Sequence, residues 1–358
     1  MNVSDSMTEQ ENVHVADRER YSRQMLFAPI GEAGQAKLLQ ARVAIVGMGA
    51  LGTVLANHMV RAGIGFVRLI DRDFVERSNL QRQMLYDEAD AAGSAPKAEA
   101  AAARLGAANS GVVIEPVVAD LNFANAEQLL ADVQLILDGT DNFAVRFLIN
   151  DVSVKHGIPW IYGGAVSSRG VSHTVIPGET PCLRCLFDQP PARGTTETCD
   201  TAGVIGSIIH TVASHQAAEA LKLLVEAHQQ LNCKMVHWDL WYNQYAAIDV
   251  AKARKADCPC CAKRQFEYLD ASLEEDTIQT LCGRNSVQIQ PVASASLSLE
   301  EWAERLKPLG RVEKNPFLLK LHLDESLTLV LFPDGRMIVQ GTEDPTVAKS
   351  LYSRYIGM

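Results

Sequence analysis

Residues 47–52, with the sequence GMGALG, have the glycine spacing of a loop that binds nucleotide phosphates. Gly47 would permit a sharp turn, Gly49 would let the backbone approach a phosphate, and Gly52 would allow close packing of a helix on a strand. Asp71 ends the next apolar run and could accept hydrogen bonds from ribose hydroxyl groups. The pattern predicts a nucleotide-binding unit in which the amino end of the helix offers N–H groups to phosphates. The alternative is a set of glycines that serve only a tight turn.

Further charged residues follow the same part of the sequence. Arg82 lies in the run SNLQRQ, Lys97 lies in APK, and Asp141 lies in GTDN after another apolar run. Ligands of an open parallel sheet bind at the carboxyl ends of its strands, so Asp71, Asp141 and the glycine loop should converge there. Two cations and a carboxylate of the kind that binds magnesium suit a triphosphate better than the diphosphate of a dinucleotide. Taken singly, each of these residues would more often form a surface ion pair, so the prediction depends on the set.

Two Cys-x-x-Cys pairs predict a metal site. Cys182 with Cys185, and Cys258 with Cys261, supply the four thiolates of a closed, structural zinc site. The long separation between the pairs excludes a compact zinc ribbon, so the metal would join distant segments of the chain. Cys260 competes as a ligand, but the C-x-x-C spacing favours Cys258 with Cys261. The alternative is four thiols without a metal, in a chain whose cysteines should stay reduced.

Strands and helices in alternation must position these residues. Apolar runs predict strands at residues 43–47, 66–71, 112–118 and 133–137, with helical stretches between them. This alternation is typical of an α/β fold with a doubly wound, Rossmann-like, mostly parallel sheet. A hairpin is expected near residues 171–176.

We expect three parts along the chain. Residues 1–18 form a flexible tail, residues 19–265 a nucleotide-binding domain whose C-terminal part is joined by zinc, and residues 266–358 a small α+β accessory domain. The elements predicted for the accessory domain are strands at 286–290, 318–323, 327–332 and 337–340, and helices at 299–309 and 346–355.

The composition excludes several classes of protein. Of 358 residues, 47% are hydrophobic and 21% are charged, which is an ordinary globular balance. The net charge of −10 argues against a general surface for nucleic acid or anionic membrane. No apolar run approaches about 18 residues, so no transmembrane helix is expected. The polar first eighteen residues do not resemble a signal peptide, and we therefore predict a cytoplasmic protein.

The motifs taken together resemble those of the MoeB/ThiF family, over roughly residues 18–264. In order along the chain they are RYSRQ, GMGALG, SNLQRQ, APK, GTDN, PCLRC, TCDTAGVIG and CPCC. Members of this family are bacterial relatives of ubiquitin-activating enzymes and adenylate the C-terminal glycine of a small ubiquitin-fold sulfur carrier. The resemblance implies that residues 19–265 form an ATP-binding adenylation domain that uses ATP and Mg²⁺. It also implies a carrier ending in Gly-Gly, a sulfur donor such as a cysteine desulfurase or rhodanese, and a role in thiamine thiazole or molybdopterin synthesis.

The resemblance also implies roles for individual residues. Asp71 would hold the ribose and Asp141 the Mg²⁺, while Arg82 and Lys97 would neutralise the phosphates. Other roles carried over from the family fall to Asn79 and Gln83, which would line the pocket, and to Arg23, which would reach a nucleotide phosphate from the neighbouring subunit of a homodimer.

Cys199, in the segment GTTETCDTAG, resembles the acceptor cysteine of ubiquitin-activating relatives. There it would form a covalent link to the carrier as a persulfide, acyl disulfide or thioester. The alternative is a thiol that adenylation does not need.

Two other functions compete with adenylation. An NAD-dependent oxidoreductase would use the same glycine loop, but it leaves Arg82, Lys97 and the GTDN motif unexplained. A non-catalytic scaffold for a ubiquitin-like protein would not need an intact set of phosphate-binding residues. For the accessory domain, the alternatives are a packing appendage and a docking site for the carrier or the sulfur donor.

Overall fold

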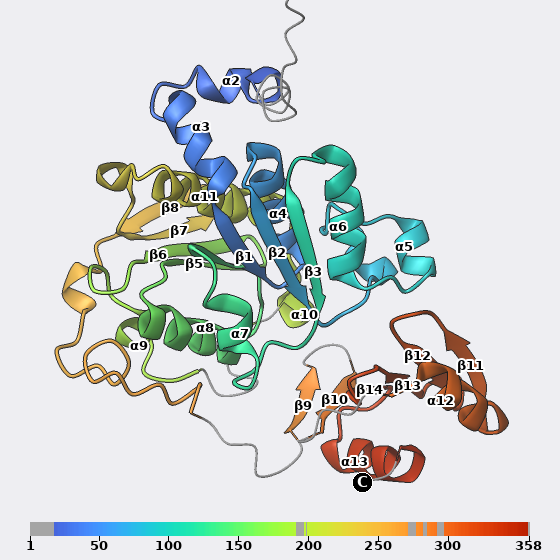
Figure 1. Cartoon of the computed structure of the whole chain (residues 1–358). Helices are drawn as coiled ribbons and strands as arrows, with labels where there is room; N and C mark the ends of the chain where they lie inside the picture. Colours follow the sequence, from blue (N-terminus) through green and yellow to red (C-terminus); the bar gives the residue numbers. More distant parts are fainter. Residues whose placement is uncertain are drawn as a thin grey trace, which may run out of the picture.

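The computed structural model describes residues 18–190, 197, 199–270, 277–281, 285–291 and 297–356. They form two β-sheets, the larger of which has the strand order β3-β2-β1-β4-β5-β6-β7-β8 (Figure 1). Its strands are β1 (Arg42–Val46), β2 (Phe66–Asp71), β3 (Val113–Val118), β4 (Leu135–Asp138), β5 (Trp160–Val166), β6 (Arg169–Val175), β7 (Met235–Asp239) and β8 (Gln244–Ile248). Strands β1 to β5 are parallel and β6 to β8 are antiparallel, which confirms a mostly parallel α/β sheet.

The change from parallel to antiparallel pairing has a local cause. Only Ser167 and Ser168 separate β5 from β6, and a connection this short permits a hairpin but no crossover. Ser167 adopts a positive φ of 57° in this turn. The predicted hairpin is therefore present, and it begins earlier in the chain than the sequence indicated.

The central strands of the large sheet are buried on both faces, and their alternate residues point to opposite sides. Val43 and Ile45 of β1 belong to one hydrophobic core, whereas Ala44 and Val46 belong to the other. The first core includes residues of helices α3 (Gly31–Gln40), α4 (Ala50–Ala62), α6 (Lys97–Ala108) and α11 (Gly206–Leu224). The second includes residues of helices α7 (Ala126–Leu130), α8 (Phe143–His156) and α9 (Leu183–Leu186).

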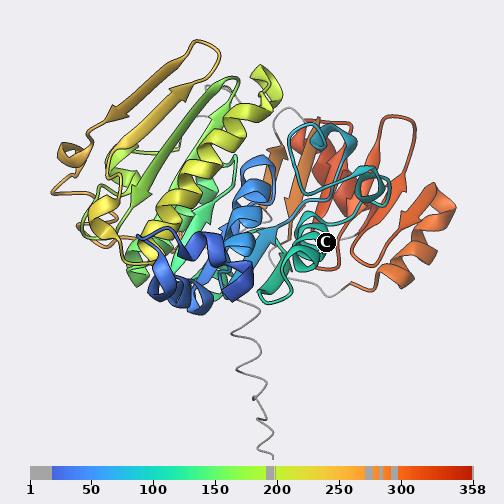
Figure 2. The same ribbon diagram turned by 90° about the horizontal axis from the view of Figure 1, so that it is seen from above.

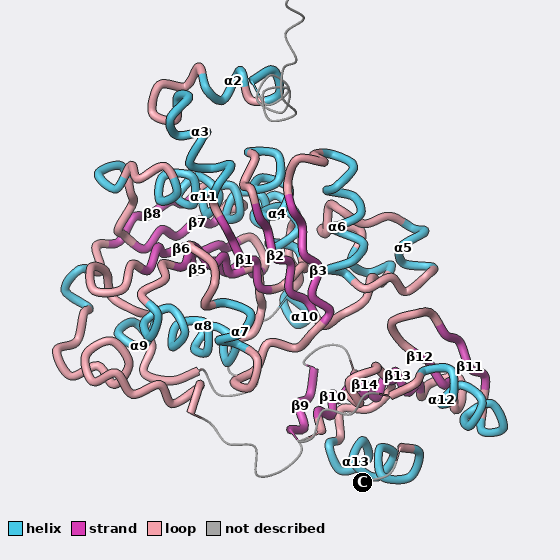
Figure 3. Tube along the Cα trace, viewed as in Figure 1, coloured by secondary structure: helices cyan, strands magenta, loops and turns pink. Residues whose placement is uncertain are grey.

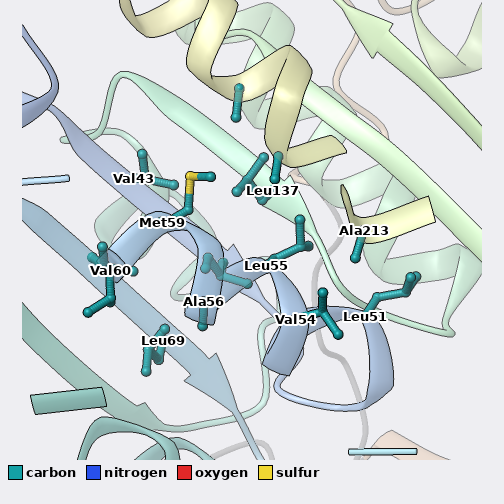
Figure 4. Packing of buried hydrophobic residues seen from close by; sticks show 14 of the residues in the cluster. Val43, Leu51, Val54, Leu55, Ala56, Met59, Val60, Leu69, Leu137 and Ala213 are labelled. Atoms are coloured by element: carbon teal, nitrogen blue, oxygen red, sulfur yellow. The ribbon is translucent and has the colours of Figure 1, made fainter. Parts of the chain in front are cut away.

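Helix α4 connects the glycine loop to the first core. Its apolar residues pack between the strands and helix α11, as Figure 4 shows for Leu55 and Met59 beside Leu137 and Ala213. The helix begins directly after Gly49 and ends at Gly63, whose φ of 82° closes the carboxyl end. This packing fixes the amino end of α4 at the carboxyl edge of the sheet.

The second sheet has the order β11-β12-β13-β14-β10-β9, and all its neighbouring strands are antiparallel (Figure 3). Its strands are β9 (Thr277–Leu281), β10 (Ser286–Gln290), β11 (Arg311–Lys314), β12 (Leu319–His322), β13 (Thr328–Leu331) and β14 (Met337–Gln340). Helices α12 (Leu299–Leu306) and α13 (Pro345–Tyr355) cover one of its faces. The opposite face is turned toward the large sheet's unit (Figure 2).

The second sheet confirms a small α+β unit, although the sequence did not predict β9 and β11. Both lie at the edges of the sheet, and Arg311–Lys314 alternates polar residues with a single valine, which gives no apolar run to detect. The proposed boundary after residue 265 stays a prediction. Phe266 and Leu269 pack in the core of the large unit.

The remaining short elements are α2 (Ser22–Met25), α5 (Glu88–Ala92), α10 (Cys199–Ala202), and the 3-10 turns η1 (Arg77–Asn79), η2 (His228–Gln230), η3 (Ala251–Ala253) and η4 (Lys307–Leu309). Across the described ranges, no helix combines the length and apolar character that a membrane crossing requires.

Candidate active site

The glycine loop lies against the loop that follows β4. A Cβ atom on Gly47 would stand 2.8 Å from the carbonyl oxygen of Gly139, and a Cβ on Gly52 would stand 1.8 Å from the carbonyl oxygen of Gly47. Gly47 also has a φ of 87°, which side-chain-bearing residues rarely adopt. Beside Gly49 the nearest neighbour of such a Cβ is Gln83 Nε2 at 3.9 Å. The glycines at 47 and 52 are therefore required by close packing, while Gly49 leaves room for a ligand.

Asp71, the last residue of β2, is tied to the glycine loop. Its Oδ2 accepts a hydrogen bond of 2.6 Å from the backbone N–H of Met48, and its Oδ1 accepts one of 2.7 Å from that of Asp73. Burial raises the pKa of Asp71, although Lys97 and both backbone N–H groups act in the opposite direction. Each carboxylate oxygen keeps a second lone pair, with which Asp71 can accept a hydrogen bond from a ribose hydroxyl.

Lys97 is the first residue of α6 and is only 2% exposed. Its Nζ lies 3.3 Å from Oδ2 of Asp73, and its backbone N–H donates to the carbonyl oxygen of Asp73 over 2.9 Å. The hydroxyl of Tyr86 lies 2.7 Å from the Met48 carbonyl oxygen and 3.1 Å from that of Lys97. Tyr86, which the sequence analysis missed, thus joins the glycine loop to the start of α6. A buried ammonium needs anionic partners, and a phosphate would provide another.

The segment SNLQRQ contributes one unsatisfied polar atom to this edge. Gln83 is buried, and its Oε1 has no hydrogen-bond partner in the described part of the chain. Asn79 is also buried, and its Oδ1 accepts a hydrogen bond of 3.0 Å from the N–H of Glu76. Arg82 is half-buried, and its Nη1 donates to the carbonyl oxygen of Ser78 over 2.9 Å. Gln83 therefore offers a free acceptor beside the glycine loop, which fits a hydroxyl or amino group of a nucleotide.

Asp141 is exposed in the loop between β4 and α8, and a buried arginine holds that loop. Arg146 donates from Nε to Asp138 Oδ2 over 2.8 Å and from Nη2 to the carbonyl oxygen of Thr140 over 2.6 Å. Burial by itself lowers the pKa of Arg146, but the nearby carboxylates of Asp138 and Asp141 help to raise it above its usual value. Gln216 of α11 donates to the Asp138 carbonyl oxygen over 3.0 Å. Sequence reasoning missed Arg146 and Gln216 because neither lies in a recognisable spacing.

Arg23 lies on α2, at the opposite edge of the large sheet (Figure 1). Gln24 on the same helix donates to the carbonyl oxygen of Ala62 over 2.9 Å, at the carboxyl end of α4. The glycine loop lies at the other end of α4. One chain by itself therefore does not bring Arg23 to Asp71, whereas it does bring together the loops that carry Asp71, Lys97 and Asp141.

Four cysteine sulfurs form a compact cluster. The Sγ atoms of Cys182, Cys185, Cys258 and Cys261 all lie within 4.8 Å of one another. The Sγ atoms of Cys182 and Cys185 are 3.9 Å apart, those of Cys182 and Cys258 are 3.7 Å apart, and those of Cys185 and Cys261 are 3.5 Å apart. Tetrahedral coordination with Zn–S bonds of about 2.3 Å places sulfurs about 3.8 Å apart, so the cluster has the dimensions of a zinc site.

The neighbouring cysteine Cys260 does not belong to the cluster. Its Sγ accepts a hydrogen bond of 3.2 Å from Nδ2 of Asn150. Burial raises the pKa of Cys261 to about 12, so without a cation this thiol stays protonated at neutral pH. Zn²⁺ would supply the charge that four thiolates need.

Cys199 is the first residue of α10, and its side chain lies outside the described part of the structure.

A doubly wound sheet with a glycine loop, a tethered carboxylate and a buried lysine at its carboxyl edge defines a nucleotide-binding α/β protein. Residues 21–260 match the sequence profile of the ThiF family, and the chain belongs to this family.

Known relatives extend this assignment. The chain is 45% identical over 340 residues to the sulfur carrier protein ThiS adenylyltransferase of Bacillus subtilis, a match that covers 94% of this chain and 99% of that one. It is 38% identical over 259 residues to a sulfur carrier protein adenylyltransferase of Thermus thermophilus, covering 70% and 94% of the two chains. The crystal structure of E. coli MccB with ATP superposes with a TM-score of 0.59 at 22% identity, over 72% of this chain and 82% of that one. The last comparison supports the fold alone.

Proposed function

We propose that this protein is an adenylyltransferase that uses ATP to activate the C-terminal glycine carboxylate of a small ubiquitin-like sulfur carrier. The main support is the match over nearly the whole chain to an adenylyltransferase that acts on the sulfur carrier ThiS. The gathering of the glycine loop, Asp71, Lys97 and the Asp141 loop at one edge of the sheet is consistent with it. The match to that relative favours a carrier of the thiamine thiazole pathway over one of molybdopterin synthesis.

The reaction is an in-line displacement at the α-phosphorus of ATP. A carboxylate oxygen of the carrier forms a bond to phosphorus while the bond to the bridging oxygen breaks, and pyrophosphate leaves with both electrons of that bond. The protein positions the two reactants and stabilises the charge that develops on the leaving group. In this proposal Asp71 holds the ribose, Gln83 and Asn79 line the pocket, and Arg82 and Lys97 neutralise phosphate charge.

A magnesium ion suits the same site. Asp141 is an exposed carboxylate on a loop that Arg146 holds rigid, so it can offer an oxygen ligand without loss of packing. Mg²⁺ bound there would neutralise phosphate oxygens during the displacement.

The direct test of the function is exchange of labelled pyrophosphate into ATP. With a carrier ending in Gly-Gly, we expect exchange that depends on both the carrier and Mg²⁺. A panel of such carriers identifies the substrate, because only the right one should support exchange. A non-catalytic scaffold would show no exchange with any carrier. An NAD-dependent oxidoreductase, which the relatives do not favour, would bind NAD in calorimetry in place of Mg-ATP.

We also propose that the enzyme acts as a homodimer in which Arg23 completes the partner's site. Arg23 is exposed, and beside it Leu26 and Phe27 are 73% and 59% exposed. Large apolar side chains this accessible suit contact with a second protein surface. Since Arg23 lies at the edge opposite the glycine loop, it can serve a nucleotide only from another subunit.

A mixture of two inactive variants tests this arrangement. Arg23→Ala and Asp141→Asn should each be nearly inactive alone. Mixed in equal amounts after subunit exchange, half of the dimers are hybrids, and each hybrid has one site with both residues intact. We expect about a quarter of wild-type exchange activity from this counting. If Arg23 served its own chain, the mixture would stay inactive.

Sulfur transfer follows adenylation in this proposal. The acyl adenylate of the carrier is open to attack by sulfur from a donor such as a cysteine desulfurase or rhodanese. Cys199 stays a predicted acceptor for that step, with a thiol that adenylation does not need as its alternative. The zinc of the four-cysteine cluster has a structural role, because a closed four-thiolate site leaves no position for a substrate.

A further inference from the structure

The small sheet packs on the segment that follows Asp71. Phe74 lies three residues after Asp71 and is buried. Its apolar neighbours come from the face of the small sheet that lies opposite helices α12 and α13; they are Leu318, Val330, Phe332 and Ile338. This accessory module, residues 277–356, therefore shares a core with the segment that follows the end of β2.

The same module also holds the segment before Lys97. Nδ2 of Asn315 donates to the carbonyl oxygens of Gly93 and Ser94, at 3.1 Å in both cases. Nζ of Lys320 donates to Ser94 Oγ over 2.6 Å and lies 4.4 Å from the centre of the Phe74 ring. Ser94 is three residues before Lys97. The module thus contacts the chain on both sides of the Asp73–Lys97 ion pair.

These two segments of the large unit are joined to each other. Phe74 and Pro96 form an antiparallel bridge, and the N–H of Val75 donates to the carbonyl oxygen of Ala95 over 2.8 Å. A shift of either segment would therefore move the other, together with Lys97.

Arg336 of the module reaches the residue next to Asp71. Its Nη2 donates to the carbonyl oxygen of Arg72 over 2.8 Å, and its guanidinium carbon lies 3.7 Å from the centre of the Phe332 ring. The side chain of Arg72 is held as well, since its Nη1 donates to Asp120 Oδ1 over 2.9 Å. Gln288 of the module donates to the other oxygen of Asp120 over 3.0 Å. Both the backbone and the side chain of Arg72 are therefore linked to the module.

Stability alone does not account for Arg336. It is 1% exposed, yet its Nε and Nη1 have no hydrogen-bond partner in the described residues, and the nearest carboxylate, that of Asp334, is 3.8 Å from Nε. Burial of a guanidinium with unused donors is costly, and apolar side chains of similar volume often fill such buried positions with no loss of stability. What Arg336 adds is a directed hydrogen bond to one carbonyl group beside Asp71.

We propose that the accessory module is a fixed part of the nucleotide site and that Arg336 is a positioning residue for ATP. By holding the Arg72 carbonyl, Arg336 keeps the Asp71 carboxylate on the N–H of Met48, in reach of the ribose. Lys320 and Asn315 do the same for the segment that ends at Lys97. The inference deepens the proposed function and rests on it, because it assigns the ligand that this edge binds.

The test is Arg336→Met in the full-length chain, since Met keeps the apolar length and removes the hydrogen bond. We expect the KM for Mg-ATP in carrier-dependent exchange to rise about tenfold, in keeping with the loss of a hydrogen bond from a charged group. The KM for the carrier and kcat should change less than about twofold. The Kd of Mg-ATP alone, measured by calorimetry, should rise by the same factor. Arg311→Met is the matched control, because Arg311 lies on the edge strand β11 and its guanidinium forms an ion pair with Glu313 of the same strand.

An unchanged KM and Kd for Mg-ATP in folded Arg336→Met would overturn the positioning role, as would a fall in kcat alone. If Arg336→Met does not fold, Lys320→Met tests the proposal in its place. We expect this variant to raise the KM for Mg-ATP about threefold, and an unchanged KM would overturn the proposal. A wild-type protein that binds no Mg-ATP would instead refute the proposed function itself.

Discussion

Replacing Asp141 with Asn should lower carrier-dependent pyrophosphate exchange by about 10²–10³-fold, the usual effect of losing one group that stabilises developing charge. The carboxylate lies on an exposed turn, so the substitution removes charge without opening a cavity. The weaker ligand should also raise the concentration of Mg²⁺ that gives half-maximal activity. Exchange measured across a magnesium titration checks both effects.

The control for this variant is Asp249→Asn, another exposed aspartate, which accepts a hydrogen bond from the N–H of Ala251. It should exchange pyrophosphate at the wild-type rate. Melting temperatures of both variants should equal that of the wild type, since neither side chain packs in a core. Full activity of Asp141→Asn at low magnesium would refute the proposed metal ligand.

Removal of the metal from the cysteine cluster should lower the melting temperature by on the order of 10 °C. The cluster joins the segment around α9 to residues 258–261, and without Zn²⁺ the four sulfurs lose the bonds that hold these segments together. For a chain of this size a loss of several kcal/mol corresponds to a shift of that order. Thermal unfolding with and without a strong chelator measures it, and metal analysis should give one zinc per chain.

Cys258→Ser and Cys260→Ser form a matched pair for the same prediction. The sulfur of Cys258 lies in the cluster, whereas that of Cys260 accepts a hydrogen bond from Asn150 outside it. The first variant should lose zinc and the stabilisation, and the second should keep its zinc. Wild-type protein without zinc, or an unchanged melting temperature after chelation, would contradict the four-thiolate site.

The two units of the chain have a closer relation than a catalytic domain with an appendage. Phe74 of the large unit is buried against apolar residues of the small sheet. Arg336 extends from that sheet to the residue that follows β2. An interface of this kind makes nucleotide affinity depend on residues more than 250 positions away in sequence. Truncation before residue 277 would therefore expose Phe74 and leave the Arg72 carbonyl without this donor.

The sequence by itself determined the features that depend on local spacing. The glycines at 47 and 52, the acidic end of β2 and the Cys-x-x-Cys pairs could be recognised because backbone geometry restricts which residues a tight turn or a metal knuckle accepts. The alternation of apolar runs likewise predicted the parallel part of the sheet, since each buried strand must be apolar on both faces.

Only the tertiary structure decided which distant residues support these motifs. Arg146 and Gln216 hold the Asp141 loop, Tyr86 joins the glycine loop to α6, and Arg336 reaches Arg72 across the interface of the two sheets. None of these residues has a sequence signature, because each contact joins segments whose proximity arises from packing and not from their separation along the chain. The tertiary structure also decided the position of Arg23. Helix α2 is bonded to the carboxyl end of α4, whereas the glycine loop lies at the amino end of α4, so Arg23 is far from its own glycine loop.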